Sequence, residues 1–119
     1  MTDIATVVDG YIAMWNEPRD ERRREIIART WADDATYVDP VLQGDGPDGI
    51  NAMIAGAQEQ FPGHRVELTG EPDAHHDRVR FAWRMLDPNG ATAIAGVDFA
   101  TLAGDGRLRE VTGFLESGD

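Results

Sequence analysis

The spacing of apolar residues changes near residue 64, and this change constrains the fold more than any other feature of the sequence. Over most of residues 3–61 the apolar side chains recur at helical intervals, whereas from His64 onward they alternate with polar ones. Helices followed by a run of strands indicate an α+β protein. We therefore expect a cone: a curved antiparallel sheet wrapped around three N-terminal helices.

Three segments of the first half are predicted to form these helices. Residues from about 3 to 16 carry an apolar stripe that includes Tyr11, and a proline follows them. Asp20 should cap a second helix, with Trp31 on its inward stripe and the run "ERRRE" facing solvent. A third helix follows "GDGPDG" and buries a stripe that contains Met53.

The strands are predicted from alternation and from turn residues. The short stretch "ATYVDP" is interpreted as a strand in which Tyr37 and Asp39 share one face. Four further strands should form a meander joined by the turns "HHD", "DPNG" and "GDG". Their sequences are "HRVELTGEPDA", "DRVRFAWRML", "ATAIAGVDFATLA" and "RLREVTGFLE".

Length and charge limit the classes of function. A chain of 119 residues suits one domain, here taken as 1–119. Its net charge of −11 repels phosphate backbones and anionic membranes, so we expect neither a nucleic-acid nor a membrane partner. The absence of cysteine removes disulfides and thiolate chemistry. The N-terminus lacks the basic flank and apolar run of a signal peptide, so a cytoplasmic protein is expected.

Asp98 interrupts an apolar strand, and the pattern leaves its orientation open. Both faces of "AIAGVDFATL" carry apolar residues, so the carboxyl could face solvent or the core. In the core, loss of hydration would raise its pKa, and the acid could stay protonated and donate a hydrogen bond. Tyr11 has a similar ambiguity, because a tyrosine on a helix stripe can simply fill the core.

A cone is open at one end, and a pocket at that mouth suits a small apolar molecule. One face of "VRFAWRML" is apolar and should point inward. We expect five large side chains to contact a ligand: Trp31, Met53, Phe81, Trp83 and Met85.

The order of these elements resembles a known superfamily, as do the stretches "VVDGYIAMWN", "ADDATYVDPV", "RVELT" and "AGVDFATLAGDGRL". It is the nuclear-transport-factor-like superfamily, in its ketosteroid isomerase and SnoaL-like polyketide cyclase branches. The resemblance implies that Asp39 is a general base beside a carbonyl, and that Tyr11 and Asp98 hold the enolate oxygen. It also implies an isomerase or cyclase that needs no metal or organic cofactor.

Some residues depart from the isomerase pattern. Ile54 stands where the isomerase has a supporting tyrosine, so this chain should have a shorter network of hydrogen-bond donors than the isomerase. Trp31 and Trp83 are expected to fill space, which argues against a steroid substrate. The Asp39–Pro40 step is a candidate cis peptide, because the resembling family uses an Asp-Pro step to aim its base.

Two other functions stay open alongside the proton-transfer enzyme. The first is a non-catalytic domain that binds a hydrophobic ligand. The second is an epoxide-hydrolase-like enzyme, which needs a polar cluster that Arg80 and Arg84 would not supply if they face outward. A metal site at His75 and His76 is not expected, since adjacent hairpin residues diverge and no third ligand is evident.

A homodimer is expected from the outer face of the sheet. Val97, Phe99 and Phe114 would be exposed there unless a second copy covered them.

Overall fold

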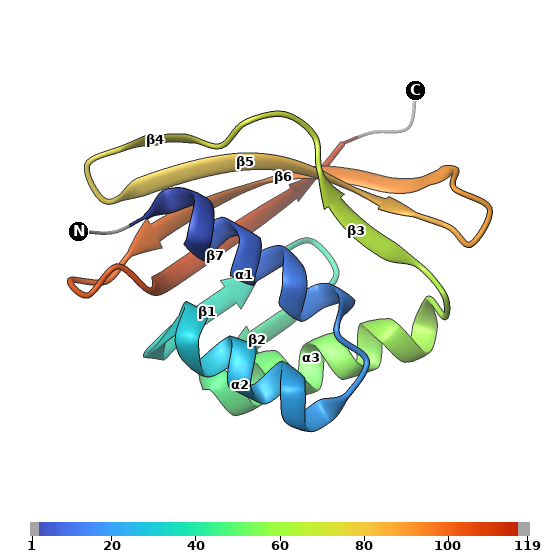
Figure 1. Cartoon of the computed structure of the whole chain (residues 1–119), viewed down its shortest axis with the longest axis horizontal. Coiled ribbons are helices and arrows are strands. Elements are labelled where there is room, and N and C mark those ends of the chain that lie inside the picture. The colour runs from blue at the N-terminus through green and yellow to red at the C-terminus, as the bar shows by residue number, and fades with distance from the viewer. Residues whose placement is uncertain (1–2, 117–119) are drawn as a thin grey trace.

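The computed structural model describes residues 3–116 and confirms the α+β class, with three helices against a curved, unclosed sheet (Figure 1). No helix in this range has the length and apolar character needed to cross a membrane. The helices are α1 (Ile4–Asn16), α2 (Asp20–Thr30) and α3 (Gly46–Gln60). The strands are β1 (Trp31–Val38), β2 (Gln43–Asp45), β3 (Arg65–Leu68), β4 (Asp73–His75), β5 (Arg78–Leu86), β6 (Thr92–Leu102) and β7 (Leu108–Leu115).

Helix α1 forms where the sequence predicts it, because both of its ends carry suitable signals. The Asp3 carboxylate accepts hydrogen bonds from the backbone N–H of Ala5 at 3.1 Å and the hydroxyl of Thr6 at 2.8 Å, which caps the first turn. Glu17, which precedes a proline, is extended and ends the helix. The helix buries a stripe of side chains: Val7, Val8, Tyr11 and Met14.

The boundary between α2 and β1 differs from the prediction. Asp20 is the first residue of α2 rather than its cap, and its carboxylate accepts hydrogen bonds from Arg24 and Asn51, each at 2.9 Å. Trp31 begins β1 instead of continuing α2, because its backbone pairs with Leu108 of β7. Tertiary pairing here overrides a helical periodicity that is only a local preference.

The sheet has the strand order β2-β1-β7-β6-β5-β3, with β4 also paired to β5. Its pairs are antiparallel except for β1 and β7, which run parallel. The sheet is therefore mixed, whereas the sequence predicted an antiparallel one. Turn residues reveal only strands that are neighbours in sequence, and β1 and β7 are not. Because β7 pairs with both β1 and β6, the end of β1 and the middle of β6 lie at the same level of the sheet on opposite sides of β7.

One predicted strand is divided in two. The stretch 64–74 forms β3, which pairs with the second half of β5, and β4, which pairs with the first half. Gly70 separates them with a positive φ of 97°, a conformation that other residues rarely adopt. The short strand β2, which pairs with β1 just before α3, was not predicted.

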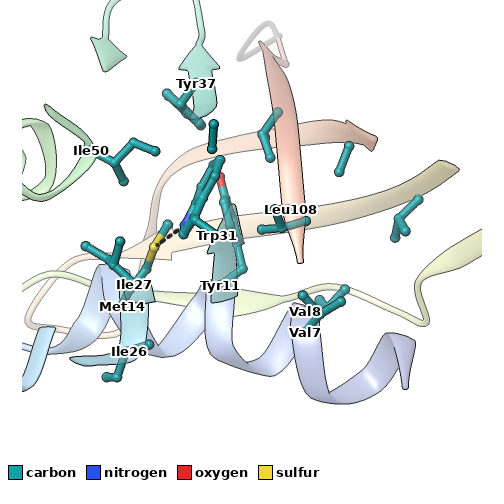
Figure 2. Packing of buried hydrophobic residues seen from close by; sticks show 14 of the residues in the cluster. Val7, Val8, Tyr11, Met14, Ile26, Ile27, Trp31, Tyr37, Ile50 and Leu108 are labelled. Atoms are coloured by element: carbon teal, nitrogen blue, oxygen red, sulfur yellow. Dashed lines mark hydrogen bonds between the residues drawn. The ribbon is translucent and has the colours of Figure 1, made fainter. Parts of the chain in front are cut away.

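The core lies between the helices and the concave face of the sheet (Figure 2). Trp31 is fully buried, and its indole N–H donates to the sulfur of Met14 at 3.0 Å. The ring of Tyr11 packs against Phe81 at 5.0 Å and against Trp31 at 6.0 Å between centroids. Burial of an aromatic side chain stabilises a fold by roughly 1.5–3 kcal/mol, so this cluster anchors α1 firmly to the sheet.

Candidate active site

Asp98 points into the cone. It lies in the middle of β6, opposite Phe81 of β5 and Gly113 of β7, and only 1% of its surface is exposed. It shares the inner face of β6 with Ala100, while Phe99 faces outward. Of the two orientations that the sequence left open, the inward one is therefore correct.

Two side chains hold the Asp98 carboxyl. The hydroxyl of Tyr11 donates to Oδ2 at 2.5 Å, and the indole N–H of Trp83 donates to Oδ1 at 3.0 Å. Burial raises the pKa of Asp98 to about 6; the two hydrogen bonds oppose this rise, and the charge of Asp39 adds to it. Burial, with the Asp98 charge second, also raises the pKa of Tyr11 well above its usual value, so Tyr11 remains a donor.

The bond from Trp83 decides which oxygen of Asp98 carries a proton. An indole nitrogen is a donor only, so the oxygen that faces it, Oδ1, must accept. The proton of the neutral acid therefore belongs on Oδ2, beside the hydroxyl of Tyr11. If the direct Tyr11–Asp98 hydrogen bond opens, a ligand oxygen within reach of both groups meets two donors, which is the requirement for holding an enolate.

Asp39 stands just beyond the end of β1 and is fixed through both of its oxygens. Oδ1 accepts the backbone N–H groups of Val41 at 2.8 Å and Leu42 at 2.7 Å, and Oδ2 accepts the hydroxyl of Tyr37 at 2.5 Å. The peptide bonds of residues 3–116 are all trans, so the expectation of a cis Asp39–Pro40 bond is wrong. Hydrogen bonds in the turn after β1 aim this carboxylate without an isomerised proline.

Gly113 of β7 separates the two acids and allows them to share one site. A Cβ at this position would lie 2.8 Å from Oδ1 of Asp98, 3.0 Å from Cβ of Asp39 and 3.4 Å from the hydroxyl oxygen of Tyr37. Any larger residue would press on both carboxyl groups. A single glycine inside the strand "EVTGFLE" is the sequence signal for this close approach of the two aspartate side chains to β7. The alternation of apolar residues does not indicate it.

A cavity of about 140 Å³ opens beside these groups. Tyr11, Asp39 and Asp98, which the sequence placed in one site, all line it, together with Trp83 and Met85. The rest of the wall is mainly apolar and includes Trp15, Phe61, Val66, Ile94 and Leu115. The site is thus a mainly apolar pocket that also contains two carboxyl groups and two phenols.

Three residues predicted to contact a ligand do not line this cavity. Trp31, Met53 and Phe81 are buried in the core cluster behind it. Ile54 is also fully buried outside the cavity. Tyr37 of β1 adds a second phenol to the cavity, besides Tyr11, and its hydroxyl contacts Asp39. The sequence placed Tyr37 on the same face as Asp39 without assigning it a role.

The remaining candidates lie on the exterior. The guanidinium of Arg80 pairs with Asp73 at 2.9 Å and that of Arg84 with Glu67, both exposed, so neither arginine reaches the cavity. His75 is also exposed, in the β4–β5 hairpin. Among residues 3–116, no three His, Cys, Asp or Glu side chains are arranged to hold a metal ion.

Comparison with known proteins gives one match to a family profile. A profile described as a SnoaL-like domain matches residues 8–111. Among curated proteins, none matches the sequence significantly.

Solved structures give further matches. A protein of the SnoaL-like family from Agrobacterium tumefaciens, whose name suggests an isomerase, is 43% identical, with a TM-score of 0.91 over 95% of this chain and 97% of its own. A protein from Sinorhizobium meliloti, whose name suggests a polyketide cyclase, is 16% identical, with a TM-score of 0.71 over 91% and 93%. A protein with a cystatin-like fold from Nostoc punctiforme is 11% identical, with a TM-score of 0.74 over 97% and 90%.

Proposed function

Because the chain belongs to the SnoaL-like family, we propose that it catalyses proton transfer on a small apolar carbonyl compound without a cofactor. One observation carries the proposal: Asp98 is buried and held by two donors, in the same cavity as Asp39. An acid with a pKa near 6 can be neutral while a second carboxyl is charged, and the pair then divides into a donor and a base.

The reaction follows from these positions. Asp39 Oδ2 takes a proton from the carbon beside the carbonyl, and the electron pair of the broken C–H bond moves onto the carbonyl oxygen. Asp98 and Tyr11 donate hydrogen bonds to the resulting enolate oxygen. Asp39 can then return the proton to another carbon, which is isomerisation. Alternatively, the enolate carbon attacks a second carbonyl carbon and closes a ring, the electron pair of that carbonyl moves onto its oxygen, and Asp39 returns the proton to this new alkoxide, as in a cyclase.

The volume of the cavity limits the size of the substrate. At about 140 Å³ it is close to the roughly 150 Å³ of an engineered apolar cavity that binds benzene. One six-membered ring fits such a space, whereas the four fused rings of a steroid do not. We therefore expect a compound with one ring in the cavity and any further atoms at its mouth.

A binding experiment tests the oxygen-holding end directly. An acidic phenol such as 4-nitrophenol imitates the enolate, and its binding should quench the fluorescence of Trp83. Asp98→Ala should weaken this binding by about 1–3 kcal/mol, the scale of a lost charge-assisted hydrogen bond. Asp9→Asn, which removes an exposed charge on α1, is the control and should change nothing. If Asp98→Ala binds 4-nitrophenol as tightly as the wild type, the proposed catalytic function is refuted and only ligand binding by the cone remains.

A second experiment separates an enzyme from a carrier. A monocyclic β,γ-unsaturated ketone gains ultraviolet absorbance when it isomerises to the conjugated form, and the protein should accelerate this change. Asp39→Asn should abolish the acceleration because the amide cannot act as the base. Mass spectrometry of a co-purifying ligand gives the complementary result: an enolisable ketone supports the enzyme, and a saturated lipid supports the carrier.

The expected homodimer and cytoplasmic location stay predictions. On the outer face of the sheet Phe99 is 45% exposed and Phe114 is 53% exposed. Their rings pack edge to face, with 5.8 Å between the ring centroids. Exposed aromatic pairs of this kind favour association between copies.

A further inference from the structure

The hydroxyl of Tyr37 contacts the Asp39 carboxyl and faces the same small region beside Gly113 as the Asp98 carboxyl. It donates to Asp39 Oδ2 at 2.5 Å. The position of a Cβ on Gly113 lies 3.4 Å from this hydroxyl oxygen and 2.8 Å from Asp98 Oδ1, so both oxygens border one small volume. Tyr37 also lines the cavity together with Tyr11, although only 2% of its surface is exposed.

Only one oxygen of Asp39 has room for a transferred proton. Oδ1 already accepts two backbone N–H groups, those of Val41 and Leu42, and these donors cannot turn away. A proton removed from the substrate must therefore reside on Oδ2, the oxygen that Tyr37 contacts. Two O–H groups cannot both donate to each other, so protonated Oδ2 becomes the donor and the Tyr37 oxygen becomes its acceptor.

The hydroxyl hydrogen of Tyr37 must then find another acceptor. The phenol does not lose this hydrogen, because burial first and the charge of Asp98 second raise the pKa of Tyr37 far above its ordinary value. Within the shared cavity the new negative charge lies on the enolate oxygen beside Asp98 and Tyr11. This oxygen is the strongest acceptor that the reaction creates.

We infer that Tyr37 is a third donor to the enolate oxygen, released for that task only when Asp39 takes the substrate proton. The inference rests on the proposed function. In this step the C–H bond breaks, the Oδ2–H bond of Asp39 forms, and the electron pair moves to the enolate oxygen. Tyr37 keeps its own proton and turns its hydroxyl. Such a bond is absent with bound substrate and forms as charge develops, so it accelerates the chemical step rather than tightening substrate binding.

The substitution Asp39→Asn reproduces the state after proton transfer. Its amide oxygen must face the N–H groups of Val41 and Leu42, which leaves the NH₂ group toward Tyr37. The amide thus donates to Tyr37, as the protonated acid would, and frees its hydroxyl. An enolate analogue such as 4-nitrophenol should sense the freed donor.

A double-mutant cycle with 4-nitrophenol tests the inference. Tyr37→Phe alone should change the dissociation constant by less than about twofold, because the hydroxyl is engaged with Asp39. Asp39→Asn should tighten binding about tenfold, the scale of a hydrogen bond to a charged group. Adding Tyr37→Phe to Asp39→Asn should remove most of this gain. Tyr11→Phe is the matched control, since that donor is present in both states and should weaken binding equally in both backgrounds.

The outcomes separate the two proposals. If Asp39→Asn tightens binding equally with and without the Tyr37 hydroxyl, the gain is only removed charge repulsion and the inference on Tyr37 is overturned. If Asp98→Ala leaves 4-nitrophenol affinity unchanged, both the proposed function and this inference fail. Urea unfolding of each variant checks its fold, and Asp39→Ala, which also frees Tyr37, gives the same cycle should the amide variant fold poorly.

Discussion

The buried carboxyl of Asp98 should make the protein more stable in mild acid than at neutral pH. Its pKa is about 6 in the folded protein against 3.8 for an exposed carboxyl. Between these values the folded state holds a proton that the unfolded chain releases, so the free energy of unfolding falls as pH rises. The stabilising contribution is complete below pH 3.8 and is lost as pH passes 6. Two pKa units at about 1.4 kcal/mol each give a change of about 3 kcal/mol.

The substitution Asp98→Asn isolates this effect. The amide oxygen can accept from Trp83 while its NH₂ group donates to the Tyr11 oxygen, so the new side chain keeps both partners. Urea unfolding followed by tryptophan fluorescence gives the free energy at each pH from 4 to 8. We expect Asp98→Asn to exceed the wild type by about 3 kcal/mol at pH 8 and to match it near pH 4.

Other carboxyl groups change the free energy of unfolding with pH in the opposite direction. Their contributions cancel when the free energy of the wild type is subtracted from that of Asp98→Asn. Hydrogen bonds hold the pKa values of several other carboxyls below their usual range, so their stabilisation is lost as pH falls; they are Asp3, Glu17, Asp20 and Asp105. These groups are present in both proteins. Asp9→Asn should run parallel to the wild type. A difference between Asp98→Asn and wild type that is constant from pH 4 to 8 would refute the raised pKa.

Three further perturbations address the site and its surroundings. Gly113→Ala should cost about 1–3 kcal/mol of stability and weaken 4-nitrophenol binding, because its Cβ would lie 2.8 Å from Asp98 Oδ1; Gly56→Ala, whose Cβ meets no atom within 4 Å, should do neither. Trp83→Phe removes a hydrogen bond that lowers the pKa of Asp98, so carboxyl NMR should show this pKa raised above that of the wild type. Phe99→Asp on the outer face should convert a sedimenting dimer into monomer, and a wild type that is monomeric at micromolar concentration contradicts the expected interface.

The sequence predicts the fold class well because period and turn chemistry are local signals. The change of period near residue 64 and the hairpin turns identify three helices and most strands. It fails at Trp31, whose helical spacing is a weaker influence than its pairing with Leu108 at the far end of the chain. The parallel β1–β7 pair was missed for the same reason, since no local turn encodes it.

The site is predictable in part. The resemblance placed Tyr11, Asp39 and Asp98 in one site, whereas the alternation pattern alone could not decide the inward direction of Asp98, because its strand is apolar on both faces. The role of Tyr37 depends on the turn that aims Asp39 back toward it, which single-residue patterns do not describe. The contact across Gly113 depends on strand order, and strand order was the weakest part of the prediction.

The central place of β7 also bears on how the chain reaches its folded state. Arg109 of β7 contacts Asp34 of β1 across 75 residues of sequence, and closing such a long loop slows folding. Until β7 inserts, β1 and β6 each present an unpaired edge that can capture a strand of another chain. The binding pocket is complete only after insertion, because Asp39, Gly113 and Asp98 belong to three segments that β7 unites. A ligand that binds only the completed pocket would therefore stabilise the folded state, with β7 inserted, over states in which β1 and β6 are unpaired.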